Sequence, residues 1–219
     1  MQQNENGRTM IEMLGVLAII GVLSVMGIAG YQKAVSKYYI NRTIQNITQM
    51  VQHTRIVFGS QKDYSGLGTG DEIANVMFSA DLAPKDMLTL DQNGEYVKPY
   101  VFKNKYKGIV SMRASDRAVE GDNMAFIIRF EQLPKNACID VATSAWGGTN
   151  GNGYVALVIN PKSEEPETDD LRTTNCVTTP LTQKNKAVHC TGHGIMLAAA
   201  AAGGCFDRPQ GNTIEIKFY

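Results

Sequence analysis

A long stretch of this 219-residue chain has no charge: the 18 residues 13–30 contain no Asp, Glu, Lys or Arg. As an α-helix they would span about 27 Å, close to the roughly 30 Å hydrocarbon core of a bilayer. Proline is also absent before Pro84, so no residue of that type interrupts a helix there. These absences predict an unbroken helix over residues 9–58, whose first half is long and apolar enough to cross a membrane.

The first seven residues, MQQNENG, contain an acid, Glu5, but no Lys or Arg. A secretory signal peptide has a basic start and an apolar core of roughly 7–15 residues, so this segment does not fit that class. An ordinary single-span anchor explains the apolar length and Arg8, but neither Gly7 nor Glu12. A carboxylate at the start of an apolar helix, such as that of Glu12, costs about 2–3 kcal/mol or more unless it is paired.

The chain has no net charge, because 21 Lys and Arg balance 21 Asp and Glu, so it gives no general argument for nucleic-acid binding. No Ser-His-Asp nucleophile motif, phosphate-binding glycine loop or paired acid–base group stands out, which argues against an enzyme. The metal-like pair His189 and His193 lacks the carboxylate of an HExxH motif and is interrupted by glycine. We therefore expect no catalytic residues, no metal and no cofactor.

Cysteine is absent from the first 137 residues and occurs at four later positions: Cys138, Cys176, Cys190 and Cys205. An exported domain reaches an oxidising compartment, so two disulfides are expected. Four cysteines allow three pairings, and the residues alone do not choose among them. The cysteines belong to residues 59–219, a segment long enough for one globular domain with its own core, which we call the head.

The predicted helix changes character along its length. Residues 8–30 form the apolar half, in which small residues recur at every third position from Gly15 to Gly30 and let membrane helices approach closely. Residues 31–58 predict an amphipathic helix that lays one face on the head. Its apolar positions recur at helical spacing: Ile40, Ile44, Ile47, Val51 and Phe58.

The head is predicted to be α+β with an antiparallel sheet. Residues 60–107 are expected to be irregular and Gly-rich, with one possible strand over 95–102. Four further strands are predicted, the first two as a hairpin: residues 108–113, 124–130, 154–159 and 212–218.

Short helices are also predicted in the head. One covers residues 137–145 and is capped by Asn136, and a second opens near Pro180 and reaches Val188. A further turn or two is expected at residues 198–202. The acidic segment 160–175 predicts a solvated surface loop.

Residues 7–12, Gly-Arg-Thr-Met-Ile-Glu, and the apolar run behind them resemble the N-terminal signature of type IV pilins and the related pseudopilins. The resemblance implies a leader, residues 1–7, that a prepilin peptidase removes between Gly7 and Arg8 before it methylates the new terminus. It also implies that Glu12, then the fifth residue, pairs with the terminal amine of a neighbouring subunit. Arg8 departs from the family, where Phe or Met is the commoner first mature residue.

The stretch from Leu133 to Cys138 and the end of the chain from Cys205 to Phe218 resemble type IVb pilins, whereas the short leader is more similar to the IVa branch. In type IVb pilins a helix that carries one cysteine is joined to a cysteine just before the last strand. The resemblance therefore implies a Cys138–Cys205 disulfide. It leaves Cys176–Cys190 as the second bond, which closes a surface loop.

As a member of that family, the chain is expected to have the type IV pilin fold and to be a structural subunit of a pilus. The resemblance implies that the inner membrane holds the precursor through residues 8–30 and that mature subunits polymerise with identical or related pilins into an extracellular fibre, the fimbrium. Two alternatives remain: a minor tip subunit that binds a host surface or DNA, and a pseudopilin of type II secretion.

A strip of lysines and aromatic side chains is the reason for considering DNA. It comprises Lys98, Lys103, Lys105 and Lys107, interleaved with Tyr100, Phe102 and Tyr106. Such strips bind single-stranded nucleic acid. A strand with a solvated basic face is the simpler explanation.

Overall fold

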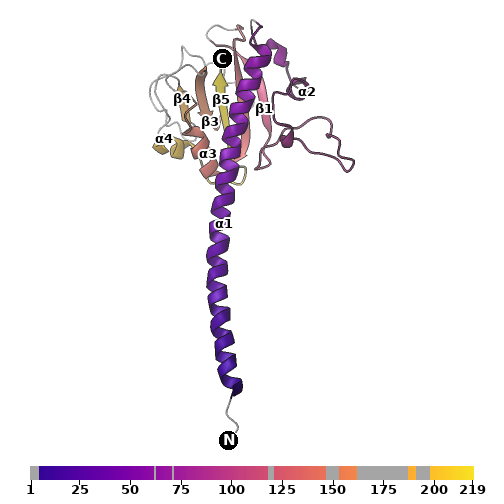
Figure 1. Cartoon of the computed structure of the whole chain (residues 1–219). Coiled ribbons are helices and arrows are strands. Elements are labelled where there is room, and N and C mark those ends of the chain that lie inside the picture. Colours follow the sequence, from indigo (N-terminus) through magenta and orange to yellow (C-terminus); the bar gives the residue numbers. More distant parts are fainter. Residues whose placement is uncertain are drawn as a thin grey trace. The chain divides into compact units, whose positions relative to one another are not determined.

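The computed structural model describes residues 5–61, 63–70, 72–117, 121–146, 153–161, 187–190 and 198–219. The chain divides into two compact units, Met1–Asn41 and Arg42–Tyr219. The described part of the first unit is helical throughout and belongs to α1 (Glu5–Phe58), which continues into the second unit (Figure 1). The helix predicted over residues 9–58 is confirmed.

The second unit is built on an antiparallel sheet. Its strands, among the described residues, are β1 (Val110–Ser115), β2 (Ala125–Leu133), β3 (Tyr154–Ile159), β4 (Ala187–Cys190) and β5 (Asn212–Phe218). They are arranged in the order β1-β2-β5-β3-β4, so the strand nearest the C-terminus lies in the centre. β1 and β2 form the predicted hairpin, and β3 and β5 have the predicted bounds. The α+β class is confirmed.

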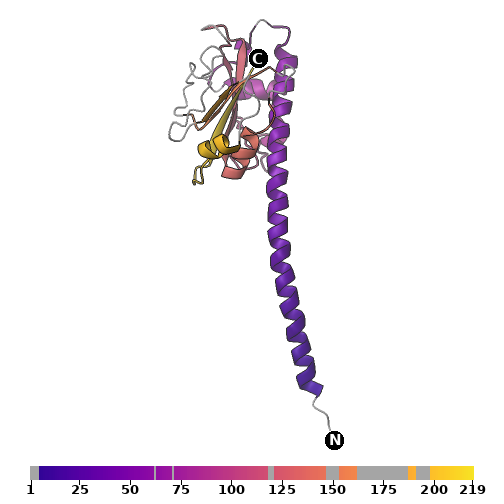
Figure 2. The same cartoon turned by 90° about the vertical axis from the view of Figure 1, so that its left-hand side faces the viewer.

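Residues 42–58 of α1 lie along one face of this sheet (Figures 1 and 2). Thr54 Oγ1 is 4.0 Å from the sulfur of Met112 in β1, and the guanidinium of Arg55 is 5.9 Å from the ring centre of Phe218 in β5. The buried side chains in this part of the helix recur every three or four residues: Thr43, Asn46, Ile47, Met50, Val51, Thr54 and Phe58. The predicted packing on the head is thus found for residues 42–58, where the buried face includes Met50 and Thr54 besides Ile47, Val51 and Phe58, whereas Ile44 is only half-buried.

The face of the sheet that meets α1 is apolar. Every second residue of β1, β2 and β5 contributes to it, as the period of two in a strand requires. Its buried side chains are Val110, Met112, Phe126, Ile128, Phe130, Ile214, Ile216 and Phe218. Full burial of such a side chain stabilises the fold by about 1.5–3 kcal/mol, so this layer is a major source of the head's stability.

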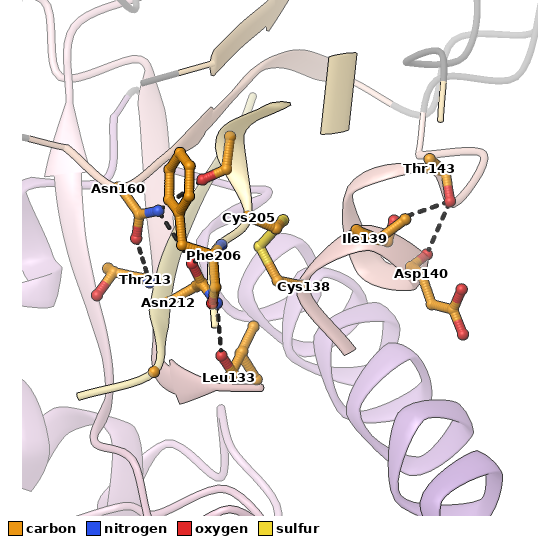
Figure 3. Close-up of a disulfide and its surroundings, with 12 residues drawn as sticks. Leu133, Cys138, Ile139, Asp140, Thr143, Asn160, Cys205, Phe206, Asn212 and Thr213 are labelled. Atoms are coloured by element: carbon orange, nitrogen blue, oxygen red, sulfur yellow. Dashed lines mark hydrogen bonds between the residues drawn. A yellow bond between two sulfur atoms is a disulfide. The ribbon is translucent and has the colours of Figure 1, made fainter. Parts of the chain in front are cut away.

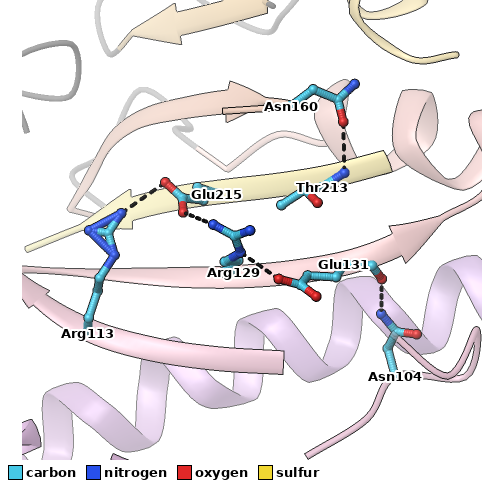
Figure 4. Close-up of polar contacts among 7 residues, drawn as sticks. All are labelled: Asn104, Arg113, Arg129, Glu131, Asn160, Thr213 and Glu215. Atoms are coloured by element: carbon cyan, nitrogen blue, oxygen red, sulfur yellow. Dashed lines mark hydrogen bonds and ion pairs between the residues drawn. The ribbon is translucent and has the colours of Figure 1, made fainter. Parts of the chain in front are cut away.

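The alternate residues of the same strands carry a chain of ion pairs on the other face (Figure 4). The two carboxylate oxygens of Glu215 in β5 lie 3.0 Å from Arg113 in β1 and 3.1 Å from Arg129 in β2. Arg129 also pairs with Glu131 at 2.8 Å. The Glu215 side chain is only 4% exposed, so its charge depends on these two partners for the hydrogen bonds that water would otherwise supply.

Two short helices lie where β2 ends and β5 begins. α3 (Lys135–Ala142) and α4 (Ala198–Gly204) contact each other. The prediction that Asn136 caps α3 is wrong, because the helix already begins at Lys135 after Pro134, and the end of α3 comes three residues before the predicted one. The turns predicted at residues 198–202 are confirmed as α4.

The prediction of a helix that reaches Val188 is wrong at its C-terminal end. Residues 187–190 form β4, in which Val188 lies opposite Val158 of β3. Pairing with β3 decides the conformation of this segment, and such pairing cannot be predicted from the propensities of the local residues. The start of the predicted helix lies outside the described residues.

Residues 60–107 contain more helix than predicted. α2 (Glu72–Ser79) and two 3₁₀ turns, η1 (Ser65–Leu67) and η2 (Lys85–Met87), occupy part of this segment. The strand predicted over 95–102 is wrong, since the described residues there contribute only an isolated bridge between Leu90 and Tyr96. Pro99 has no N–H to donate to a ladder, which disfavours a strand at this point.

An exposed carboxylate ties this segment to α1. Asp86 of η2 lies 3.2 Å from the guanidinium of Arg42 and 3.1 Å from Lys105 Nζ. Partial burial by itself raises the pKa of the Asp86 carboxyl, but the hydrogen bonds and charges of Lys105 and Arg42 outweigh it, so the pKa lies below its usual value. The pairing therefore stabilises the fold where Asp86 is ionised.

The buried ion pairs predict unequal effects of two Glu→Gln substitutions. Glu215→Gln should lower the free energy of unfolding by about 2–4 kcal/mol, because it leaves Arg113 and Arg129 without their shared carboxylate. Glu131→Gln is the matched control, since that side chain is 28% exposed and should cost about 1 kcal/mol or less. Urea unfolding of the full chain in detergent, followed by the fluorescence of Trp146, measures both. Equal losses would refute a special role for Glu215.

The Asp86 pairing predicts a stability difference that depends on pH. Asp86→Asn should cost about 0.5–1 kcal/mol at pH 7, since the side chain is 38% exposed and solvent screens the pairs. The folded-state pKa is depressed, so this contribution is present above the unfolded value of about 3.9 and disappears as the pH falls through the lower folded value. Urea midpoints measured from pH 7 down to about 2 should converge. Asp207→Asn is the control, because its 84% exposed side chain makes only a solvent-screened pair with Lys135 at 3.5 Å, and it should change the stability at pH 7 by less than about 0.5 kcal/mol.

Candidate functional site

The first unit exposes a continuous apolar surface. Its thirteen large apolar side chains between Met10 and Ile28 are 52–73% exposed within the chain. Among the described residues, one helix, Met10–Phe58, is long and apolar enough to cross a membrane, with a mean hydropathy of 2.4 in its most apolar window and none of that window buried. A core helix of a soluble protein passes the same test of length and composition, but it buries this surface inside its own chain.

The residues of the predicted processing and assembly site lie at the start of α1. The backbone at Gly7 and Arg8 is helical, and Glu12 follows on the exposed surface of the same helix. Their predicted roles involve a peptidase and a second subunit, so those roles stay proposals.

The head contains the disulfide that the family resemblance implied, Cys138–Cys205 (Figure 3). It joins α3 to the residue that follows α4, and both cysteines are completely buried. In the chain-entropy model, whose mechanism is disputed, a bond across 67 residues stabilises the fold by about 4 kcal/mol. Cys176 lies outside the described residues, as does the side chain of Cys190, so their bond stays a prediction.

Two buried asparagines beside the disulfide were not predicted from the sequence. Asn160 and Asn212 are 8% and 0% exposed and hydrogen bond to each other at 3.1 Å beside the disulfide. Asn160 follows the last residue of β3 and Asn212 is the first residue of β5, so both stand at strand ends. Asparagine at a strand end is ordinary turn chemistry, and only the fold brings the two side chains together.

The basic-aromatic strip does not form one surface. Phe102 is 1% exposed, and the ring of Tyr100 stacks on Phe78 of α2 with ring centres 4.1 Å apart. Lys98 Nζ lies 5.8 Å from the centre of the Tyr100 ring, and Lys105 pairs with Asp86. Phe102 and one face of the Tyr100 ring are therefore unavailable to stacked bases, although Lys98, Lys103 and Lys107 are exposed.

Metal ligands do not gather in the part of the chain that the structure describes. No group of three or more His, Cys, Asp or Glu is placed there to hold a metal ion. His189 lies in β4, opposite Leu157 of β3, and His193 is outside the described residues.

Residues 37–194 match the family described as PilS N terminal, which is more than half of the chain. Among solved structures, the chain is similar to a type IV b pilin from Salmonella typhi, with 15% identity, 79% of this chain and 95% of that chain covered, and a TM-score of 0.48.

It is also similar to TcpA, a type IV pilin from Vibrio cholerae El Tor biotype. The identity is 11%, the match covers 83% of this chain and 99% of TcpA, and the TM-score of 0.53 indicates a shared fold. No curated protein matches the sequence. The family match agrees with the long apolar helix, the antiparallel sheet and the Cys138–Cys205 bond, and the chain therefore belongs to the type IV pilin family.

Proposed function

We propose that this chain is a structural subunit of a type IV pilus and that it polymerises through the apolar half of α1. The observation that carries the proposal is the exposure of thirteen large apolar side chains in that half, each 52–73% exposed within the chain. Their full burial would stabilise a complex by about 20–40 kcal/mol before the costs of association. A surface of this kind needs a cover from outside the chain.

Two different covers act in turn. The inner membrane covers the precursor, because the apolar stretch has the length of a bilayer core. After cleavage between Gly7 and Arg8 by a prepilin peptidase, the helices of identical or related subunits replace the lipid. The subunit then becomes part of an extracellular fibre.

The glycines of α1 support contact with other helices. A Cβ atom added at Gly15, Gly21 or Gly27 would meet nothing within 4 Å in this chain. The chain's own packing therefore does not require glycine there, although each one costs a helix interior about 0.5–1 kcal/mol relative to alanine. Close approach by a neighbouring helix is a reason for keeping small residues at these positions.

Glu12 supplies the polar contact of assembly. Its carboxylate lies on the exposed, largely apolar surface of α1, where burial against another subunit requires a positive partner. The amine of the mature terminus at Arg8 of a neighbouring subunit is that partner. Because the guanidinium of Arg8 adds a second positive charge, Glu12 neutralises one of two charges at this end.

Replacing Glu12 should separate assembly from processing. Glu12→Ala should lower the yield of fibres in sheared cell-surface material more than about tenfold, because truncating one member of a buried charge pair costs about 2–5 kcal/mol. Cleavage after Gly7 should be unaffected. Electron microscopy of the sheared material and mass spectrometry of the mature N-terminus measure the two steps.

Glu95→Ala is the matched control, because Glu95 is an exposed carboxylate of the head. It should give normal fibres from normally processed subunits. Normal fibres from Glu12→Ala would contradict the pairing role, and a chain that keeps Met1 in the fibre would contradict the cleavage.

Exposed Lys98 and Lys103 are the observation in favour of a second role, a minor tip subunit that binds a host surface or DNA. Subunit counts in purified fibres separate an abundant major pilin from a tip protein present in a few copies. Loss of DNA uptake after replacement of both lysines would favour a DNA receptor.

A secretion assay tests the remaining alternative, a pseudopilin of type II secretion.

A further inference from the structure

Two buried asparagines, Asn160 and Asn212, hydrogen bond to the residues immediately before and after Cys205 (Figure 3). Asn160 Nδ2 donates to the carbonyl oxygen of Gly204, the residue before Cys205, at 2.7 Å. The residue after it, Phe206, donates its N–H to Asn212 Oδ1 at 2.8 Å and accepts from Asn212 Nδ2 at 2.9 Å. None of these contacts involves the sulfur atom of Cys205.

Asn212 also reaches the segment that carries the other cysteine. Its Nδ2 donates to the carbonyl oxygen of Leu133, the last residue of β2, at 3.0 Å. The next residue, Pro134, accepts the N–H of Cys138 at 2.9 Å in the first turn of α3. One amide side chain therefore joins the segment of Cys138 to that of Cys205 by hydrogen bonds that involve neither sulfur atom.

The hydrogen bonds of the two asparagines are complete. Besides their mutual bond, Asn160 Oδ1 accepts from the N–H of Thr213 at 2.9 Å and from the guanidinium of Arg208. Each amide makes four hydrogen bonds, which is its full capacity. Loss of one amide leaves buried groups unsatisfied, so the pair holds a single arrangement.

The Cys138–Cys205 bond closes a much longer loop than the competing Cys190–Cys205 bond would. Cys138 and Cys205 are 67 residues apart, whereas Cys190 and Cys205 are 205 − 190 = 15 apart. Because loop closure becomes rarer as the 3/2 power of loop length, a structureless chain would close the shorter loop about ninefold more often. The same chain would close the Cys176–Cys190 loop of 190 − 176 = 14 residues about as often as the Cys190–Cys205 loop, so loop length alone does not choose between the two pairings that contain these bonds.

We propose that Asn212, together with Asn160, brings Cys205 to Cys138 before the sulfur–sulfur bond exists and so selects this pair among the three possible pairings. Both are positioning residues, because their hydrogen bonds hold the backbone on either side of the cysteine. The selection is independent of the assembly function proposed above, since it concerns the folding of the head alone.

The oxidation itself is thiol–disulfide exchange with a small disulfide, here glutathione disulfide. The thiolate of one cysteine attacks a sulfur of the oxidant and releases one glutathione thiolate. The thiolate of the second cysteine then attacks the mixed disulfide and releases the other. The two electrons end on two glutathione molecules, and the two cysteine protons go to the released thiolates through solvent.

Oxidative refolding of the full chain tests the selection. Reduced, unfolded chain is diluted into detergent with a glutathione buffer, acid-quenched and alkylated, and its bonds are assigned by non-reducing peptide mapping. In Asn212→Ala the ratio of Cys138–Cys205 to Cys190–Cys205 bonds should fall about tenfold or more, and in Asn160→Ala by less, since fewer bonds between the two cysteine segments are lost.

Thr143→Val is the matched control. Its hydroxyl donates to the carbonyl of Ile139 at 2.8 Å within the same region of the chain, so its loss does not separate the two cysteine segments. The ratio of bonds should stay unchanged in this variant. An unchanged ratio in Asn212→Ala, or an equal fall in Thr143→Val, overturns the proposal.

A second comparison separates positioning from general stability. Wild-type chain is refolded in the urea concentration that lowers its stability to that of Asn212→Ala, and its ratio of bonds should stay above that of the variant. If the two ratios are equal, Asn212 acts only through stability and the proposal fails. It fails also if Asn212→Ala leaves the head unfolded with the native bond in place, judged by the fluorescence of Trp146.

Discussion

The apolar half of α1 has apolar side chains on every side, and its own chain does not bury them. The need for an apolar partner from outside the chain is the constraint on which the rest of the structure depends. α1 is one continuous helix with two different environments: residues 10–28 expose their apolar side chains, whereas residues 42–58 bury one face against the sheet. The hydrogen bonds of the helix backbone are internal in both halves, so the backbone tolerates lipid and protein equally. What changes along the helix is only the partner that each side chain needs.

In the head, the central strand of the sheet is the last one in the sequence. β5 pairs with β2 and β3, contributes Phe218 and Ile216 to the apolar layer, and carries Glu215 on the other face. One strand therefore completes both faces of the sheet. Its first residue, Asn212, also bonds to the end of β2 beside the disulfide. The stability of the head depends on contacts between residues that are far apart in the sequence.

This dependence explains what could be predicted from the sequence. The strands 154–159 and 212–218 and the helix 9–58 follow from periodicity and from the residues that punctuate them, which are local signals. The disulfide came from a family resemblance, because four cysteines alone leave three pairings open. The strand predicted over 95–102 failed, since Tyr96 and Tyr100 pack on Phe78 of α2 instead of alternating across a sheet.

The residues that escaped prediction share one property. Asn160, Asn212 and the shared carboxylate of Glu215 each hydrogen bond to a residue between 44 and 102 positions away in the sequence. Each is a buried polar group whose hydrogen-bond partners lie inside the head, so none of the three side chains needs a partner from another molecule. The exposed half of α1 is the opposite case, because its apolar side chains need an apolar partner that this chain does not supply. In the assembly proposed above, the head needs no change of its own, and only the exposed half of α1 exchanges one apolar partner for another.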